Sequence, residues 1–134
     1  MHYGVRLRDA CAPASDSPIF AYWRMREEQP EQLSPLLERE EAAYGVAPEQ
    51  HVLTRRGLTR VTFHLNAFPD RPLVATIKPT GGTCAANVVA QVAGRAATLD
   101  HIHIELGFLW SIQRIVLEAT EVAGRAKLEE VIEP

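Results

Sequence analysis

Apolar residues recur at every second position in several separate segments of this 134-residue chain. Because successive side chains of a strand point to opposite faces of a sheet, this period predicts β-strands rather than helices. Leu58–Leu65 shows the period most cleanly, since its Val61 and Phe63 face one way. Arg60 and Thr62 face the other way, which predicts a strand with one buried and one solvated face.

Two further segments have the same period. Ser17–Met25 carries large side chains on both faces, which predicts a strand that is covered on each side or lines a cavity. Leu73–Lys78 predicts a short strand after a turn at 66–72, because the prolines of that turn cannot donate to a sheet. No alternating helices are present to make parallel crossovers, so we expect an antiparallel arrangement.

The pentapeptide Val-Ala-Gly-Arg-Ala occurs twice, at 92–96 and at 122–126, each time between strand-like segments. Glycine at the first central position of a two-residue turn favours a type II′ hairpin. The repeat therefore predicts two hairpins, with two-residue turns that begin at Gly94 and at Gly124.

The first hairpin also predicts an irregularity in its second strand. A turn that begins at Gly94 places Ala90 opposite Leu99. Ile102 has the opposite parity to Leu99, so the apolar face shifts by one residue between them. A β-bulge near Asp100-His101 would absorb this shift.

One helix is predicted, over residues 34–44. Ser34 suits the N-cap, Pro35 suits the first helical position, and Gly45 suits the position after the last turn. The charged residues 38–41 are expected to form a solvated flank beside a narrow apolar stripe.

These elements predict one mainly β domain over residues 1–134, an antiparallel β-barrel or a two-layer β-sandwich of about eight strands with one short helix after the second strand. Apolar residues make up 46% of the chain, which is enough for an ordinary core. The net charge of −3 argues against a dedicated nucleic-acid binder. No apolar run is long enough to cross a membrane and no secretory signal is visible, so the chain as written is expected to be cytoplasmic.

Two blocks of sequence resemble a known family. The first joins PIFAYWR at 18–24 to AYGV at 43–46. The second runs from VAGR at 92–95 through LDHIHIE at 99–105 and LW at 109–110 to IVL at 115–117. Their order and spacing resemble the family called domain of unknown function 4833, over about residues 17–120. The resemblance implies a β-rich fold and a shared site, relatives that are exported, and no established reaction.

The two cysteines, Cys11 and Cys84, are too few for a disulfide scaffold and lack the spacing of a zinc finger. In a cytoplasmic chain we expect both thiols to be reduced. An extracytoplasmic setting of the family would allow them to form a disulfide.

The segment HIHIE at 101–105 is the one arrangement with metal-ligand spacing. On a strand, His101, His103 and Glu105 would share one face, and His64 would join them from a neighbouring strand to hold zinc or iron. A polar row on the solvated face of a half-buried strand gives the same pattern, and we favour this second interpretation.

A second group of candidates consists of Tyr22, Arg24, Tyr44 and Trp110. Tyr22 and Arg24 share one strand face, and Tyr44 closes the predicted helix. A guanidinium beside two phenols can hold an anion or a planar ligand. Trp110 would line a ligand mouth or cap one end of the fold, although a packing role is the favoured alternative for all of these aromatic residues.

We therefore expect a non-catalytic module that binds a small-molecule ligand or a protein partner in a cavity bordered by these residues, with neither nucleic acid nor membrane as partner. No catalytic residue set is visible, and no cofactor beyond the candidate metal is expected. One alternative is a metal-dependent enzyme in which the HIHIE segment holds a metal that activates water. Another is a structural subunit whose tail, Ile112–Ile132, pairs across a homodimer edge.

Overall fold

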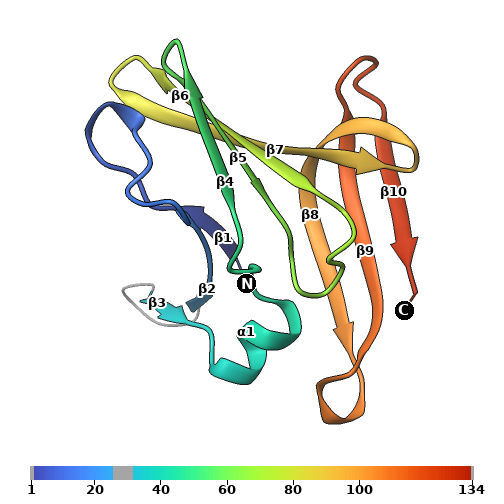
Figure 1. The fold of residues 1–134 in the computed structure, drawn as a ribbon. Coiled ribbons are helices and arrows are strands. Elements are labelled where there is room, and N and C mark those ends of the chain that lie inside the picture. The colour runs from blue at the N-terminus through green and yellow to red at the C-terminus, as the bar shows by residue number, and fades with distance from the viewer. Residues whose placement is uncertain (1, 26–31, 134) are drawn as a thin grey trace.

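The computed structural model describes residues 2–25 and 32–133, without the side chains of Arg24, Met25, Gln32, Leu33 and Trp110. Within these ranges the chain forms ten strands, one α-helix and two short 3-10 helices (Figure 1). The strands are β1 (His2–Val5), β2 (Ile19–Met25), β3 (Gln32–Pro35), β4 (His51–Arg55), β5 (Leu58–Phe63), β6 (Leu73–Thr80), β7 (Thr83–Val92), β8 (Arg95–Leu106), β9 (Ile112–Glu121) and β10 (Lys127–Ile132). The helices are α1 (Glu38–Tyr44), η1 (Asp9–Cys11) and η2 (Phe108–Trp110).

The strands form two antiparallel sheets, so the prediction of a mainly β, antiparallel fold is confirmed. β1, β2 and β3 form a small sheet, and β4 to β10 form a large sheet in which each strand pairs with its neighbours in the chain. β4 and β10 are the edges of the large sheet, so it is open and the prediction of a closed barrel is wrong. Figure 1 shows this sheet curving round from β4 to β10, with the small sheet and α1 beside its inner face.

One hydrophobic core joins the two sheets. Val61, Phe63 and Leu65 are all buried, as their alternation predicted, while Arg60 is exposed. The core also contains Ile19 and Ala21 of β2, Leu73, Ala75 and Ile77 of β6, and Ile115, Leu117 and Ala119 of β9. Packing of β2 against the large sheet therefore takes place through apolar side chains on one face of each sheet.

The first Val-Ala-Gly-Arg-Ala hairpin forms as predicted, but with a different turn. Its central residues are Ala93 and Gly94, and both have positive φ, 51° and 76°. Two positive φ angles belong to a type I′ turn rather than a type II′ turn. Ala90 consequently pairs with Ala97 instead of Leu99, so the predicted register is wrong by two residues. A shift of two residues keeps every side chain on the same face.

The second Val-Ala-Gly-Arg-Ala hairpin also forms, but its loop spans four residues, 122–125. The backbone N–H of Glu121 donates to the carbonyl of Ala126 at 2.8 Å, and that of Arg125 donates back to Glu121 at 3.1 Å. The positive φ lies at Arg125, 59°, rather than at Gly124. The predicted two-residue turn is therefore wrong here, and the same five residues make two different turns.

The predicted bulge in β8 is confirmed. The pairing of β8 with β9 shifts between Leu99 and His101, so Asp100 is the extra residue. After the shift, Ile102 and Ile104 pack against the core on the same side as Leu99. The bulge thus keeps the apolar side chains of β8 on one face.

The helix is shorter than predicted and follows the third strand rather than the second. Ser34 and Pro35 lie in β3, where they pair with β2, so long-range pairing prevails over the capping preference of these residues. α1 begins after Leu37 and ends at Tyr44, with Gly45 at the C-cap as predicted. No helix in the described ranges is long and apolar enough to span a membrane.

Cys11 and Cys84 form a disulfide with a Cα–Cα distance of 5.7 Å, so the expectation of two reduced thiols is wrong. Cys11 ends η1 and Cys84 lies in β7. The bond therefore ties the segment between β1 and β2 to the large sheet, and such bonds persist in oxidising compartments.

Replacing both cysteines by serine is expected to lower the free energy of unfolding by about 4 kcal/mol, because the bond restricts an unfolded chain. The cysteines lie 73 positions apart, so a long loop is released when the bond is lost. Urea denaturation with and without dithiothreitol measures the effect. The reductant should destabilise the wild type and leave the Cys11→Ser, Cys84→Ser variant unchanged. A wild type that is insensitive to reductant would contradict the prediction.

Candidate functional site

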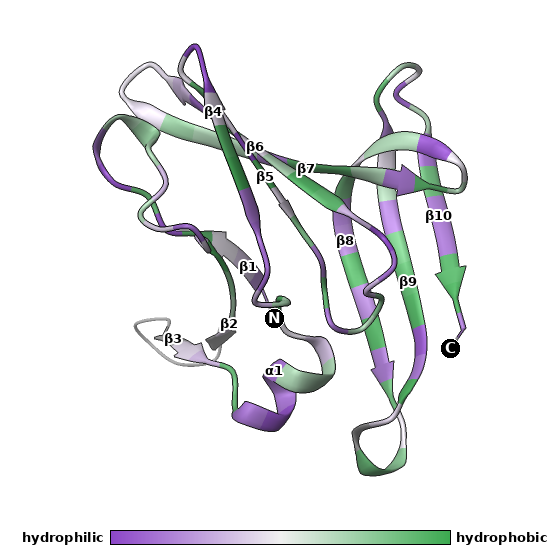
Figure 2. Cartoon of the chain, viewed as in Figure 1, coloured by the Kyte–Doolittle hydropathy of each residue, from purple (hydrophilic) through white to green (hydrophobic). Residues whose placement is uncertain are grey.

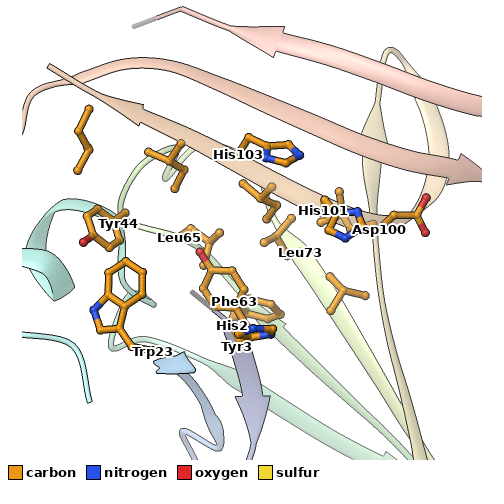
Figure 3. A pocket seen from close by; sticks show the side chains of 15 residues that line it. His2, Tyr3, Trp23, Tyr44, Phe63, Leu65, Leu73, Asp100, His101 and His103 are labelled. Atoms are coloured by element: carbon orange, nitrogen blue, oxygen red, sulfur yellow. The ribbon is translucent and has the colours of Figure 1, made fainter. Parts of the chain in front are cut away.

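A cavity of about 700 Å³ lies between the small sheet and the inner face of the large sheet (Figure 3). Its volume falls within the range of about 300–1,000 Å³ that is usual for small-molecule sites. Aromatic rings of β1, β2 and α1 line one side, and these belong to His2, Tyr3, Trp23 and Tyr44. Mainly apolar side chains of the large sheet line the other side, among them Phe63, Leu65, Leu73, Leu99, Ile102 and Ile104, and the polar residues Asp100, His101 and His103 of β8 also line it.

The phenol oxygen of Tyr3 is buried in the cavity wall and has no hydrogen-bond partner among the described residues. In Figure 3 this hydroxyl points from β1 toward Leu65. Burial, and then the nearby Glu41 and Tyr44, raise the pKa of Tyr3 above its ordinary value. The group therefore stays protonated and can both donate and accept a hydrogen bond. Leaving such a group unpaired costs about 1–3 kcal/mol, so a ligand that pairs with it gains affinity.

Glu40 of α1 is only 7% exposed, so its expected place in a solvated flank is wrong. One carboxylate oxygen accepts hydrogen bonds from the Leu37 backbone N–H at 2.8 Å and from Trp23 Nε1 at 3.2 Å. The other accepts from the Tyr44 hydroxyl at 2.9 Å. The Leu37 N–H, aided by the two side-chain donors, lowers the pKa of Glu40 despite its burial. This carboxylate therefore positions both rings at the cavity wall.

The rings of Trp23 and Tyr44 meet edge to face, with their centroids 6.3 Å apart. Burial and the adjacent carboxylate raise the pKa of Tyr44 to about 12. The polar atoms of both side chains are engaged by Glu40. Their ring surfaces are therefore what they offer to the cavity.

Tyr44 is the one predicted ligand-binding residue that lines the cavity among the described side chains. Tyr22 is not part of this wall, and its ring lies against His2 and Phe20, with centroids 5.7 and 5.4 Å away. The side chains of Arg24 and Trp110 lie outside the described residues.

Sequence reasoning did not include Trp23 or Tyr3 among the candidate ligand-binding residues. Trp23 has the same parity in β2 as the buried Ile19 and Ala21, so the period-two pattern contained the signal for its inward direction. Tyr3 lies in a four-residue strand that pairs with β2, and so short a segment carries no clear period.

His101 and His103 alternate with the inward Ile102 and Ile104 of β8 and have side chains 71% and 56% exposed, and both also line the cavity. Their rings stack with centroids 6.0 Å apart. Both approach one oxygen of Glu118 in β9, at 3.7 Å from His101 Nδ1 and 3.4 Å from His103 Nε2. The structure thus brings the two predicted histidines together, with a carboxylate that the sequence analysis did not single out.

The other two predicted metal ligands lie elsewhere. Glu105 forms an ion pair with Arg114 at 2.6 Å. His64 follows β5, which β6 and β7 separate from β8 in the sheet. Across residues 2–25 and 32–133, no three His, Cys, Asp or Glu side chains are grouped so that they could hold a metal ion.

The model of the family described as Domain of unknown function (DUF4833) matches residues 1–131. The chain belongs to this family. The match covers nearly the whole chain and confirms the resemblance that its two sequence blocks indicated. Comparisons with curated proteins and with solved structures give no match. The description of the family states no activity.

Glu40 should make the stability of this DUF4833 domain depend on pH. Its pKa in the fold lies below the ordinary value of 4.5, so its contribution is present above that pH and is lost as the pH falls through the lower folded value. Glu40→Gln is expected to lower the free energy of unfolding by about 1–3 kcal/mol at pH 7. It should also flatten the loss of stability in acid.

Urea denaturation from about pH 7 to about pH 3 measures this slope. Asp100 and Glu130 also have lowered pKa values, so some acid dependence will persist in the Glu40→Gln variant. Glu38→Gln is the matched control, because Glu38 is an exposed residue of the same helix. Equal slopes for the Glu40→Gln variant and the wild type would show that the prediction is wrong.

Proposed function

We propose that this DUF4833 domain is a non-catalytic module that binds a small-molecule ligand between its two sheets, which pack in a sandwich-like arrangement. The buried, unpartnered hydroxyl of Tyr3 in a cavity of about 700 Å³ carries the proposal. A buried polar group without a partner destabilises a fold, and a bound ligand with one suitable polar atom relieves this penalty.

The cavity walls favour a mainly apolar ligand with an aromatic or otherwise flat part. Phe63, Leu65 and Leu73 supply an apolar surface on the side of the large sheet. Trp23 and Tyr44 supply ring surfaces on the opposite side, since their polar atoms are held by Glu40. The Tyr3 hydroxyl then orients the ligand through a hydrogen bond, as the few polar groups of small-molecule sites do.

None of the three groups Glu40, Tyr3 and Tyr44 is suited to act as a general base at neutral pH. A general base at neutral pH needs an accessible group whose pKa lies near neutrality. Glu40 is ionised, but its oxygens already accept three hydrogen bonds. The pKa values of Tyr3 and Tyr44 are both raised, which keeps these phenols protonated.

The two alternative functions predict different measurements on the purified protein. A metal-dependent enzyme would hold stoichiometric zinc or iron that is lost on replacing His101 or His103. A homodimer that pairs through the edge strand β10 would have twice the 14.9 kDa chain mass in light scattering. A monomer that is free of metal and is stabilised by a small apolar compound supports the binding module.

The variant Tyr3→Phe tests separately how the Tyr3 hydroxyl affects the stability of the fold and the affinity for a ligand. Without ligand, the variant is expected to be more stable than the wild type by about 1 kcal/mol, because an unpaired buried hydroxyl is removed. It should bind a compound that hydrogen bonds to Tyr3 about 2- to 10-fold more weakly. A thermal-shift screen of neutral aromatic compounds, followed by titration of each stabilising compound, measures both effects.

Tyr22→Phe is the matched control, because it deletes a tyrosine hydroxyl outside the cavity wall. Nile red, a neutral apolar dye, serves as a probe of the cavity independent of the screen. Failure of all neutral compounds to raise the melting temperature would count against the proposed function. So would equal effects of Tyr3→Phe and Tyr22→Phe on binding.

A further inference from the structure

The outer face of the large sheet presents a second surface, over β4, β5 and β6, on the side away from the cavity. Leu53 pairs with Arg60, and Arg60 pairs with Thr76, so these three side chains share the outer face. Alternation along each strand adds Arg55 of β4 and Lys78 of β6 to the same face.

We define the basic face as Arg55, Arg56, Arg60 and Lys78. All four side chains are exposed, and Arg56 lies in the β4–β5 turn. Figure 2 shows hydrophilic residues at this turn. Within the described ranges, no side-chain hydrogen bond or ion pair engages any of the four. Elsewhere on the large sheet and its loops, Arg71, Arg95, Arg114 and Lys127 each lie within 3.4 Å of a carboxylate oxygen.

The acidic residue next to these strands in the chain, Glu49, precedes β4 and pairs with His51 at 3.3 Å. The outward positions of β4 to β7 include neutral polar residues such as Thr62, Thr76 and Asn87, and neither aspartate nor glutamate. The whole chain nevertheless carries a net charge of −3. Four unpaired cations on one side of an acidic protein repel one another and create a positive field toward solvent. Such a field attracts an anionic partner.

Three of these arginines also share a hollow. Arg55, Arg56 and Arg60 line a shallow depression of about 850 Å³ together with Leu53 and Leu58. Leu53 is 56% exposed, so its side chain is accessible to a partner at this hollow. Guanidinium groups donate paired hydrogen bonds to carboxylate and sulfate, and the leucines offer an apolar floor.

We propose that the basic face binds a linear acidic polysaccharide. The cations extend from the hollow to Lys78, so the surface matches several anionic groups in succession rather than one. The leucines suit the apolar C–H faces of sugar rings, and Thr76 and Asn87 can hydrogen bond to sugar hydroxyls. The disulfide Cys11–Cys84 agrees with an oxidising compartment, where polymers of this kind occur.

The same residues argue against single-stranded nucleic acid as the partner. Proteins that bind single strands combine a basic groove with aromatic side chains on which the bases stack. The outward positions of β4 to β7 contain neither phenylalanine, tyrosine nor tryptophan. The basic face can therefore hold anionic groups but offers no stacking platform for bases.

The test measures binding of fluorescently labelled heparin and of polygalacturonate by anisotropy, at low and at moderate salt. The wild type is expected to bind at least one of them, and salt should weaken the binding. Replacing Arg55 and Arg60 together by glutamine should weaken binding by about tenfold or more. The charge-matched control replaces Arg8 and Arg125 by glutamine, two exposed arginines outside the basic face. Its affinity should stay within about twofold of the wild type.

Both double variants are first checked for wild-type urea midpoints, which separates lost binding from lost folding. Absence of binding to both polysaccharides at low salt would overturn the proposal, as would equal weakening in the two double variants. Single-stranded DNA and phosphatidylserine vesicles are titrated in parallel. Tighter binding of either one through Arg55 and Arg60 would replace the polysaccharide with a nucleic acid or a membrane.

Discussion

The buried apolar side chains of the large sheet all lie on its inner face, and the rest of the molecule depends on this constraint. The bulge at Asp100 keeps the apolar side chains of β8 on the inner face after Leu99. Without that extra residue, Ile102 would face solvent and His101 would face the core. The part of the cavity wall that β8 supplies would then lose its apolar side chains. One-sided burial also leaves the outer face of the sheet toward solvent, and the basic face and the histidine pair both lie there.

The period-two pattern predicted most of the strands because burial acts on each strand separately. The parity of Leu99 and Ile102 even predicted the bulge, since a change of face must be absorbed somewhere in the strand. Registers were not predictable in the same way. Moving a pairing by two residues leaves each side chain on its face, so the pattern could not distinguish a turn at Ala93-Gly94 from one shifted by a residue.

Elements that depend on contacts distant in sequence were the ones missed. Ser34 carries a local signal for a helix start, but pairing of β3 with β2 places it in a strand. Glu40 lies in a run of charged residues that is typical of a solvated flank. It is buried nevertheless, and accepts a hydrogen bond from Trp23 of β2. The cavity follows the same rule. Tyr44 could be predicted from the end of its helix, whereas Tyr3 reaches the wall only through the pairing of β1 with β2.

The bond between Cys11 and Cys84 encloses β2, β3, α1, β4, β5 and β6 in a covalent ring. A protease that cuts once within this ring, for example in the turn after Arg55, produces no separate fragments until a thiol reagent is added. After such a cut, Tyr3 in the cavity wall and the leucines of the large sheet would still belong to one molecule. A single cut in the exposed β4–β5 hairpin therefore leaves the two parts of the domain joined by a covalent bond.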